Sequence, residues 1–322
     1  MKFIIGIDLG GTSAKLALFT EDLEAIKMWQ VATSSEDHGW KIVPNIVKAL
    51  QAEILKQGLD LSDCLGIGMG SPGAIDRRKG TVTGAYNLGW ETAYPVKEEF
   101  KHLLGDFPVY IENDANVAAL GEQAKGAAAD TENMVLVTLG TGVGGGIVCN
   151  GRLLTGQASA GEIGHMIAKV DGPPCTCGSK GCIETIASAT GIHRLAEEKA
   201  LSSQVESPLA KRFKLGEDIS VKAIVDAAKN GDALGEKVMK EAMGALGITL
   251  SQLACVLNPE KIVIGGGVAN AGQYLIDQLQ EVVEANTYPP NRRHLKILLA
   301  QLGNDAGVIG AASLVLKERK RS

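Results

Sequence analysis

A repeated strand–turn–strand pattern rich in glycine places the strongest constraint on how this chain can fold. Each copy has an apolar strand, a tip of glycine and threonine, and a second apolar strand that follows at once. The first copy occupies residues 3–7, 8–12 and 15–19, and the second occupies residues 134–139, 140–146 and 147–149. Short apolar runs bounded by glycine are typical of buried β-strands. The repetition therefore predicts an internal duplication, with two related α/β halves.

The two tips can each bind an anion, because glycine leaves backbone N–H groups open to a phosphate. The tip residues are Gly10, Gly11 and Thr12 in the first copy, and Gly140, Thr141 and Gly142 in the second. The P-loop and the dinucleotide-binding fingerprint both lead from glycines into a helix, so neither motif fits. An ordinary hairpin is the alternative explanation for either tip taken alone.

A third glycine turn strengthens the case for a nucleotide site. Gly265, Gly266 and Gly267 follow a predicted strand at residues 261–264 and precede a helical pattern that starts near Ala271. Three such loops at strand ends predict a nucleotide held between the two halves. Asp8, at the end of the first strand, could hold a hydrated Mg²⁺ ion.

A cluster of cysteines near the middle of the chain predicts a zinc site. Cys175, Cys177 and Cys182 form a C-x-C-x4-C run, and His165 precedes it within the sequence GEIGH. Three cysteines and one histidine are the ligand set of a closed, structural tetrahedral zinc site. A redox dithiol or three unrelated thiols are the alternatives, and no thioredoxin-like context supports the first. Glycines at 172, 178 and 181 allow the tight bends that a short ligand loop requires.

Two carboxylates flank these ligands. Glu162 lies three residues before His165, and Glu184 lies two residues after Cys182. A metal that fixes the loop also fixes both acids, so the zinc is expected to shape a polar site.

Composition excludes several classes of function. Aromatic residues make up 4% of the chain, which does not suit a base-stacking surface, and the net charge of −5 carries no basic stripe for nucleic acid or membrane surfaces. No apolar run reaches membrane-spanning length and no signal peptide is recognisable. The length suits about two domains. We expect a soluble, cytoplasmic protein.

Between the glycine tips, Asn113 and Asp114 follow a predicted strand and precede a predicted helix at residues 115–124. That junction can place a carboxylate at the mouth of a cleft. Helix capping is the alternative, and by spacing alone it is the better explanation. Further helices are expected at residues 42–57, 185–201, 220–230, 234–257 and 306–319, with a loop at residues 202–218 and a cap from Asn304 or Asp305.

Taken together, these motifs resemble the ROK sugar kinases. DLGGT, SPG, NLGW, END, LGTGVGGG, GEIGH, C-x-C-G-x-x-G-C-x-E and the third glycine turn occur in the order and spacing of that family. The resemblance extends from Ile5 to about Leu316. It is greatest to the bacterial ROK glucokinases, through residues 112–122, 182–192 and 302–310.

The resemblance implies an actin/hexokinase-like (ribonuclease H-like) duplicated fold of two α/β domains with β-β-β-α-β-α topology. The smaller domain is expected at residues 1–116, with the C-terminal helix, residues 304–322, packing back onto it. The larger domain, residues 117–303, carries the zinc loop. ATP and a sugar are expected to bind in the cleft between the domains.

The resemblance also implies roles for individual residues. Asp114 is expected to be the general base that accepts the proton of the sugar 6-hydroxyl as it attacks the γ-phosphate of ATP, giving glucose 6-phosphate and ADP. The sugar-binding residues are expected to be Gly73, Asn87, Asn113, Asp114, Glu162, His165 and Glu184. The two glycine tips face the triphosphate, with Lys15 near it and Mg²⁺ near Asp8, and residues 265–267 lie against the adenosine.

Other members of the family define the alternatives. ROK transcriptional repressors carry a helix-turn-helix module ahead of the sugar site, and the first glycine loop here starts at residue 6, so a repressor is not expected. A sugar-binding protein without catalysis would be expected to lack Asp114 or the phosphate loops, and this chain has both. A kinase for another hexose, above all N-acetylmannosamine, shares the same motifs and stays open. The family's usual homodimer is the expected assembly.

Overall fold

The computed structural model describes residues 1–157, 159–202 and 206–320 and divides into two compact units. Unit 1 comprises Met1–Asp130, Gly146–Gly161 and Leu302–Ser322, and unit 2 comprises Thr131–Gly145 and Glu162–Gln301. The expected domain boundary at residue 116 falls inside helix α3 (Asp114–Lys125), whereas the first segment of unit 1 extends to Asp130. All of α3 stays in unit 1.

Close packing of α3 against the last helix, α11 (Ala306–Arg319), explains that difference. A Cβ added at Gly310 would come within 1.6 Å of the Val117 carbonyl oxygen, and one added at Gly121 within 2.1 Å of the Ala306 oxygen. Only glycine allows two helix backbones to approach this closely. The two helices therefore pack as a pair within unit 1.

The sheet of unit 1 has the strand order β3-β2-β1-β4-β7. Its strands are β1 (Phe3–Leu9), β2 (Ser13–Phe19), β3 (Ala25–Ala32), β4 (Cys64–Ser71) and β7 (Val109–Asn113). The first three form antiparallel hairpins, whereas β1, β4 and β7 run parallel. A separate two-stranded hairpin, β5 (Ala74–Asp76) and β6 (Thr81–Thr83), follows β4.

The second sheet repeats this arrangement as β10-β9-β8-β11-β12. Its strands are β8 (Met134–Leu139), β9 (Val143–Cys149), β10 (Arg152–Leu153), β11 (Lys261–Gly265) and β12 (Lys296–Leu299). The matching order confirms the predicted duplication. β9 begins at Val143 rather than at Ile147, so the glycines at 144–146 belong to the strand and not to the turn.

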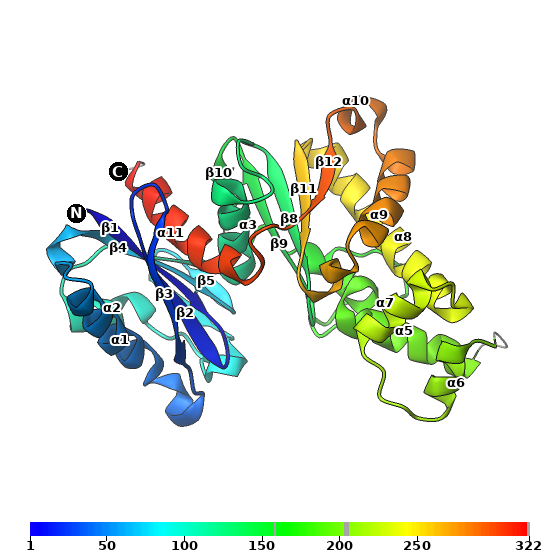
Figure 1. Ribbon diagram of the computed structural model, residues 1–322, viewed down its shortest axis with the longest axis horizontal. Helices are drawn as coiled ribbons and strands as arrows, with labels where there is room; N and C mark the ends of the chain where they lie inside the picture. The colour runs from blue at the N-terminus through cyan, green and yellow to red at the C-terminus, as the bar shows by residue number, and fades with distance from the viewer. Residues whose placement is uncertain (158, 203–205, 321–322) are drawn as a thin grey trace. The chain divides into compact units, whose positions relative to one another are not determined.

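Both faces of the first sheet are buried along its inner strands β1 and β4, whereas the edge strand β3 is partly exposed. Ile5 and Ile7 of β1 pack in a core with helices α1 (Ile42–Lys56) and α2 (Val96–Leu104), whereas Ile4 packs on the opposite face with Val308 and Ala312 of α11. Alternate residues of a strand point to opposite faces, which assigns each side chain to its layer. Figure 1 shows α1 and α2 on one face of this sheet and α11 on the other.

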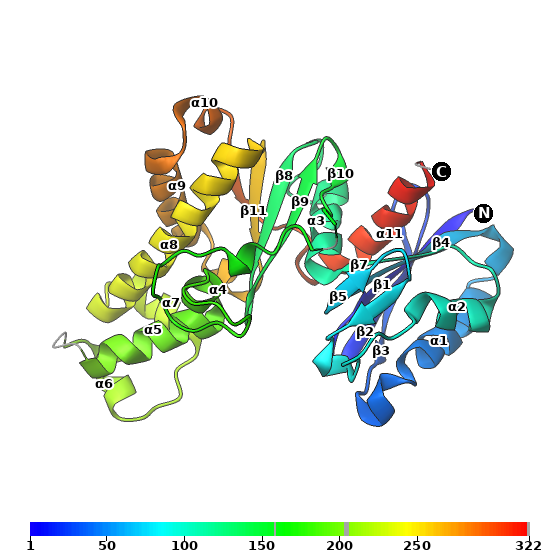
Figure 2. The ribbon, with the colours of Figure 1, turned by 180° about the vertical axis from the view of Figure 1, so that it is seen from behind.

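Helices make up most of unit 2 outside its strands (Figure 2). They are α4 (Glu184–Ala187), α5 (Ala189–Ser202), α6 (Pro208–Lys214), α7 (Val221–Lys229), α8 (Ala233–Leu257), α9 (Gln273–Asn286) and α10 (Pro289–Arg292). The helix expected over residues 185–201 is broken at Ser188, whose backbone is extended. No helix in the described part of the chain is long and apolar enough to cross a membrane.

Part of the loop expected at residues 202–218 is helical. Ser207 caps α6 by accepting a hydrogen bond from the Ala210 amide, and Pro208 occupies the first turn. Both are typical helix-start signals. Residues 203–205 of the expected loop lie outside the described residues.

Candidate active site and metal centre

The parallel strands of unit 1 bring several predicted site residues to one sheet edge. Asp8 of β1 is in register with Gly70 of β4, and Ser71 at the end of β4 is in register with Asn113 of β7. The carboxyl ends of parallel strands are where ligands bind in open α/β sheets. One edge of this sheet therefore carries Asp8, the turn that contains Gly73 and the Asn113–Asp114 corner.

At the Asn113–Asp114 corner, Asn113 caps the helix. Asn113 is the N-cap of α3, and its Oδ1 accepts from the amides of Ala115 at 3.0 Å and Asn116 at 3.4 Å. Asp114 is the first helical residue, and its Oδ1 accepts from the Ala115 amide at 2.8 Å. The capping explanation thus holds for Asn113, and the helix does not need Asp114 as its cap. The protein atoms around Asp114 displace water and raise the pKa of its carboxyl, although the side chain reaches solvent.

Glu112 supports this corner from inside the protein. Its side chain is 2% exposed and accepts two hydrogen bonds from the Arg77 guanidinium. Glu112 Oε1 also accepts from the Asn113 amide at 2.8 Å and from Asn116 Nδ2 at 3.0 Å. Sequence reasoning missed Arg77, which follows the SPG turn without any motif of its own.

Asp8 has an environment that suits a cation. Burial raises the pKa of its carboxyl to about 6, the negative charge of Asp114 adds to that rise, and Lys15 opposes it. A Cβ added at Gly307 would lie 2.3 Å from Asp8 Oδ2, so the carboxylate packs directly against the start of α11. Hard divalent cations prefer carboxylate oxygens, and a bound cation would relieve the repulsion between Asp8 and Asp114.

Lys15 is engaged within unit 1. Its Nζ donates to the Asn304 carbonyl oxygen at 2.7 Å and to Asp305 Oδ1 at 2.8 Å. Asp305 is the N-cap residue of α11 but makes no capping hydrogen bond through its side chain, in contrast to the expected cap. The Asp305 carboxylate forms an ion pair with Lys15 instead.

The first glycine tip lies beside Asn87. The Gly10 amide donates to the Ser13 carbonyl oxygen at 3.0 Å and closes the hairpin. A Cβ on Gly11 would approach Asn87 Nδ2 at 3.0 Å. Gly11, predicted to contact phosphate, therefore lies next to Asn87, predicted to contact the sugar. Gly73 has a φ of +92°, and a Cβ there would come within 2.7 Å of the Thr83 oxygen, which accounts for the glycine of the SPG turn.

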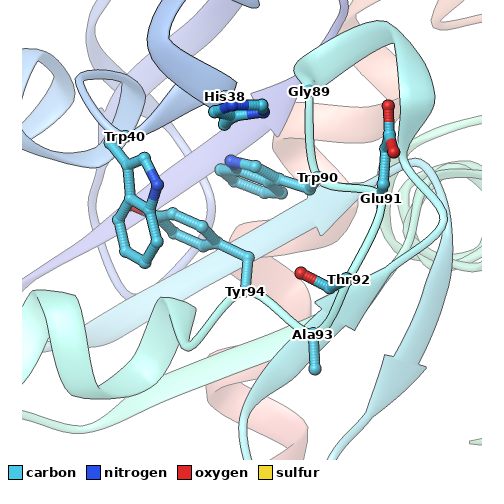
Figure 3. Close-up of a pocket in the computed structure, with 8 residues that line it drawn as sticks. All are labelled: His38, Trp40, Gly89, Trp90, Glu91, Thr92, Ala93 and Tyr94. Atoms are coloured by element: carbon cyan, nitrogen blue, oxygen red, sulfur yellow. The ribbon is translucent and has the colours of Figure 1, made fainter.

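An aromatic cluster supports the segment that carries Asn87 (Figure 3). Trp90 stacks on Tyr94 with ring centroids 4.2 Å apart, and Trp90 Nε1 donates to the Gly39 carbonyl oxygen at 3.4 Å. The Trp40 ring is tilted by 50° against the Tyr94 ring, with centroids 4.8 Å apart. These rings line a surface cavity of about 270 Å³. Sequence reasoning found the NLGW motif but missed its support by residues 38–40.

In unit 2, the second glycine tip and the third glycine turn line one cavity of about 610 Å³. Gly140, Thr141 and Gly267 were predicted to contact a nucleotide, and all three line it. Gly266 has a φ of +84° and packs against the end of β8, where a Cβ would come within 2.5 Å of the Leu139 oxygen. Sequence reasoning missed the rest of the lining, which comes from α7, the start of α5 and the turn after residue 267: Ala189, Val221, Lys222, Val225, Asp226, Lys229, Val268, Asn270 and Ala271.

The four predicted zinc ligands form one cluster in unit 2. The ligand atoms of His165, Cys175, Cys177 and Cys182 all lie within 4.8 Å of one another. His165 Nδ1 lies 3.7 Å from Cys175 Sγ, and Cys177 Sγ lies 3.6 Å from Cys182 Sγ. With metal–sulfur bonds of about 2.3 Å, the corners of a tetrahedron are about 3.8 Å apart. The donor set and its spacing therefore fit a tetrahedral zinc ion.

The backbone around the cluster is folded tightly. The Cys175 amide donates to the Ser179 oxygen at 2.8 Å, and Gly178 follows with a φ of +92°. A Cβ at Gly181 would come within 1.7 Å of the Lys169 oxygen, so the bend requires glycine, as expected. A hydrogen bond from the Ser179 backbone lowers the pKa of the Cys177 thiol to about 7, which favours the thiolate that metals bind.

The predicted sugar-binding residues are divided between the two units. Gly73, Asn87, Asn113 and Asp114 belong to unit 1, and Glu162, His165 and Glu184 belong to unit 2. Glu162 is exposed immediately before the short turn that carries His165. Glu184 is half-buried, and its Oε1 lies 3.9 Å from Cys175 Sγ, so it borders the metal cluster.

Comparisons with known proteins agree with this arrangement of motifs. A family model described as the ROK family matches residues 4–318. The chain is 42% identical to a glucokinase from Halalkalibacterium halodurans, over 98% of this chain and 96% of the relative, and 36% identical to a glucokinase from Thermotoga maritima, over 98% of each. It is 31% identical to an N-acetylmannosamine kinase from Yersinia pestis, over 96% of each.

Solved structures of ROK sugar kinases are also similar to this chain. A ROK hexokinase from Thermus thermophilus matches with a TM-score of 0.84 and 29% identity, over 99% of this chain and all of the other. A ROK family glucokinase from Streptomyces griseus, solved in complex with glucose and AMPPNP, matches with a TM-score of 0.74 and 33% identity, over 98% of this chain and 99% of the other. The actin/hexokinase-like fold class is thereby confirmed.

Proposed function

This chain belongs to the ROK family, and we propose that it transfers the γ-phosphoryl group of ATP to the 6-hydroxyl of glucose, giving glucose 6-phosphate and ADP. The observation that carries the proposal is the identity over nearly the whole chain to relatives named glucokinase. The Streptomyces griseus structure, which holds glucose and an ATP analogue, supports the assignment of both substrates.

Phosphoryl transfer asks the protein mainly to position the reactants and neutralise charge. In the proposed mechanism, Asp114 accepts the proton of the 6-hydroxyl as that oxygen attacks the γ-phosphate. A raised pKa suits this task, because a base whose pKa lies nearer the working pH accepts a proton more readily. Glu112 and Asn113 hold the backbone that carries Asp114.

The nucleotide is proposed to occupy the cavity of unit 2. Its apolar lining, Val221, Val225 and Val268, suits an adenine ring, and Gly140 and Thr141 at its edge suit phosphates. Mg²⁺ would travel with ATP and bind near Asp8. The amide of Gly11 would supply a further phosphate contact, whereas the amide of Gly10 already donates to the Ser13 carbonyl oxygen.

Glu162, His165 and Glu184 are proposed to bind sugar hydroxyls, together with Gly73, Asn87 and Asn113. A carboxylate can accept from two adjacent hydroxyls, which suits a hexose. Zinc, held by the four clustered ligands, would supply structural support only, because a closed site leaves no open position for a reacting water. His165 can bind the metal through Nδ1 and present its other ring nitrogen to a hydroxyl.

A kinase for N-acetylmannosamine is the second candidate, because a relative of that name is 31% identical over nearly all of this chain. An assay of ADP release over aldohexoses, ketohexoses and N-acetylated hexosamines decides between them. We expect glucose to give the highest kcat/KM. A higher value for N-acetylmannosamine or fructose would replace the glucose assignment. We further propose that the protein is cytoplasmic and forms a homodimer, the family's usual assembly. Light scattering of the purified protein tests the homodimer.

A further inference from the structure

The glycine tip at residues 140–142 is held on one side by the start of helix α5. The Ala189 amide donates to the Gly140 carbonyl oxygen at 2.8 Å, and Thr190 Oγ1 donates to the Thr141 oxygen at 2.9 Å. These contacts fix the direction of two successive peptide groups. Gly140 and Thr141 line the 610 Å³ cavity, so the contacts from α5 also fix one wall of that cavity.

Glu184 holds the same tip from its other end. Its Oε2 accepts a hydrogen bond from the amide of Val143, a buried residue that directly follows the tip, at 3.1 Å. A Cβ added at Gly142 would come within 2.3 Å of that oxygen. The Glu184 carboxylate therefore lies directly against the tip, and its close approach requires glycine at position 142.

The metal loop determines where Glu184 lies. Glu184 is two residues beyond the ligand Cys182, whose carbonyl oxygen accepts from the Thr185 amide at 2.9 Å and from Thr185 Oγ1 at 2.8 Å. Its Oε1 is 3.9 Å from Cys175 Sγ. These contacts join the four-ligand cluster to the carboxylate through a short, hydrogen-bonded segment.

The GEIGH segment provides a second link. Gly164 precedes the ligand His165 and packs against the Val143 backbone, where a Cβ would come within 2.1 Å of the Val143 oxygen. All of these contacts lie within unit 2. The metal cluster and the nucleotide cavity are thus joined at Val143 by two segments that each carry a metal ligand.

We infer that Glu184 is a positioning residue for the glycine tip at residues 140–142. Through Glu184, the metal cluster controls nucleotide affinity even when no sugar is bound. This inference rests on the proposed function for the identity of the nucleotide, and it adds a role to the one proposed for Glu184 at the sugar. The two roles are compatible, because a carboxylate offers about four lone-pair sites and Val143 uses one of them.

The test measures the Kd of ADP with Mg²⁺ by calorimetry, in the absence of sugar. Glu184→Ala removes the acceptor of the Val143 amide, and a hydrogen bond to a charged group is strong enough that its loss should raise the Kd about tenfold. Glu184→Gln keeps an acceptor oxygen and should recover most of the affinity. Glu162→Ala is the matched control, since it removes the other sugar-binding carboxylate of unit 2, and its Kd for ADP should stay within about twofold of the unaltered protein.

The second part of the test removes the metal ion of the four-ligand cluster by chelation, before Mg²⁺ is added. Chelation should weaken ADP binding by a similar factor, and it should have little further effect in Glu184→Ala, because groups that act through one another are not additive. An unchanged Kd in Glu184→Ala, or equal changes in Glu184→Ala and Glu162→Ala, would overturn the inference. Failure of the proposed function would show separately, as absence of ADP release with glucose by the unaltered enzyme.

Discussion

Replacement of Arg77 by Met tests how the Asn113–Asp114 corner is held. Arg77 Nε and Nη2 each donate to a different oxygen of Glu112, whose side chain is almost wholly buried, while 27% of the Arg77 side chain is exposed. The substitution keeps most of the apolar stem but leaves a buried carboxylate without its cation. Removal of one partner of a buried ion pair costs about 3–5 kcal/mol.

The lower end of that range applies here. Glu112 Oε1 would keep its hydrogen bonds from the Asn113 amide and from Asn116 Nδ2, which compensate part of the charge. We therefore expect a loss of about 3 kcal/mol, which corresponds to a decrease in Tm of roughly 6–12 °C for a domain of this size. Displacement of the corner that carries Asp114 should also lower kcat by about ten- to a hundredfold.

Thermal unfolding followed by circular dichroism, together with steady-state kinetics, provides the assay. Arg78→Met is the matched control, because it changes the same residue type at the next position of the same hairpin. Arg77→Met/Glu112→Gln should regain part of the stability, since it removes the unpaired charge while the glutamine oxygen still accepts from the Asn113 amide and Asn116 Nδ2. If Arg77→Met melts within about 2 °C of Arg78→Met, the ion pair does not support the corner and this reasoning is wrong.

Three further predictions concern the other parts of the site. Asp114→Asn keeps the shape but removes the base, so kcat should fall about 10²-fold or more with glucose affinity little changed; retention of most turnover would exclude Asp114 as the base. Asp8 has a pKa of about 6 in the folded protein against 3.8 ordinarily, so its ionised form destabilises the fold above about pH 6, and this penalty disappears as the pH falls to about 4. Without Mg²⁺, Asp8→Asn should therefore raise Tm at pH 7 but not at pH 4, and an equal effect at both values would show that Asp8 is not the cause. Elemental analysis should find one zinc ion per chain, and Cys177→Ser should lower both zinc content and Tm while raising the KM for glucose about 10–100-fold; an active enzyme that contains no zinc would contradict the assignment.

Several features of this protein could be predicted from the sequence because they depend on residues close together in the chain. The hairpin tips follow from glycines between apolar strands, and the cysteine cluster spans eight residues from Cys175 to Cys182. Strand limits were predicted to within a few residues, and β8 matched its predicted range of residues 134–139. Local spacing also indicated the duplication, since both glycine tips follow the same kind of apolar strand.

Only the tertiary structure determined which distant residues meet. Lys15 could be taken for a phosphate ligand, but it pairs with Asp305, 290 positions later in the chain. Asp305 also does not cap α11 through its side chain, because its backbone is helical (φ −96°, ψ −9°) rather than extended as in a capping residue. The cavity lining from α7 carries no motif, because an apolar helical face looks alike whether it packs against a core or against a ligand.

The glutamates show the same limit most clearly. The sequence identifies Glu112 and Glu184 as acids beside strong motifs, but it does not say what each oxygen accepts. Folding brings Arg77 to Glu112 across 35 positions and the Val143 amide to Glu184 across 41. The sequence alone determined the chemistry available at this site, through residue types at short spacing. Long-range packing decided which groups are held in place and by what, because those contacts depend on how whole strands and helices assemble.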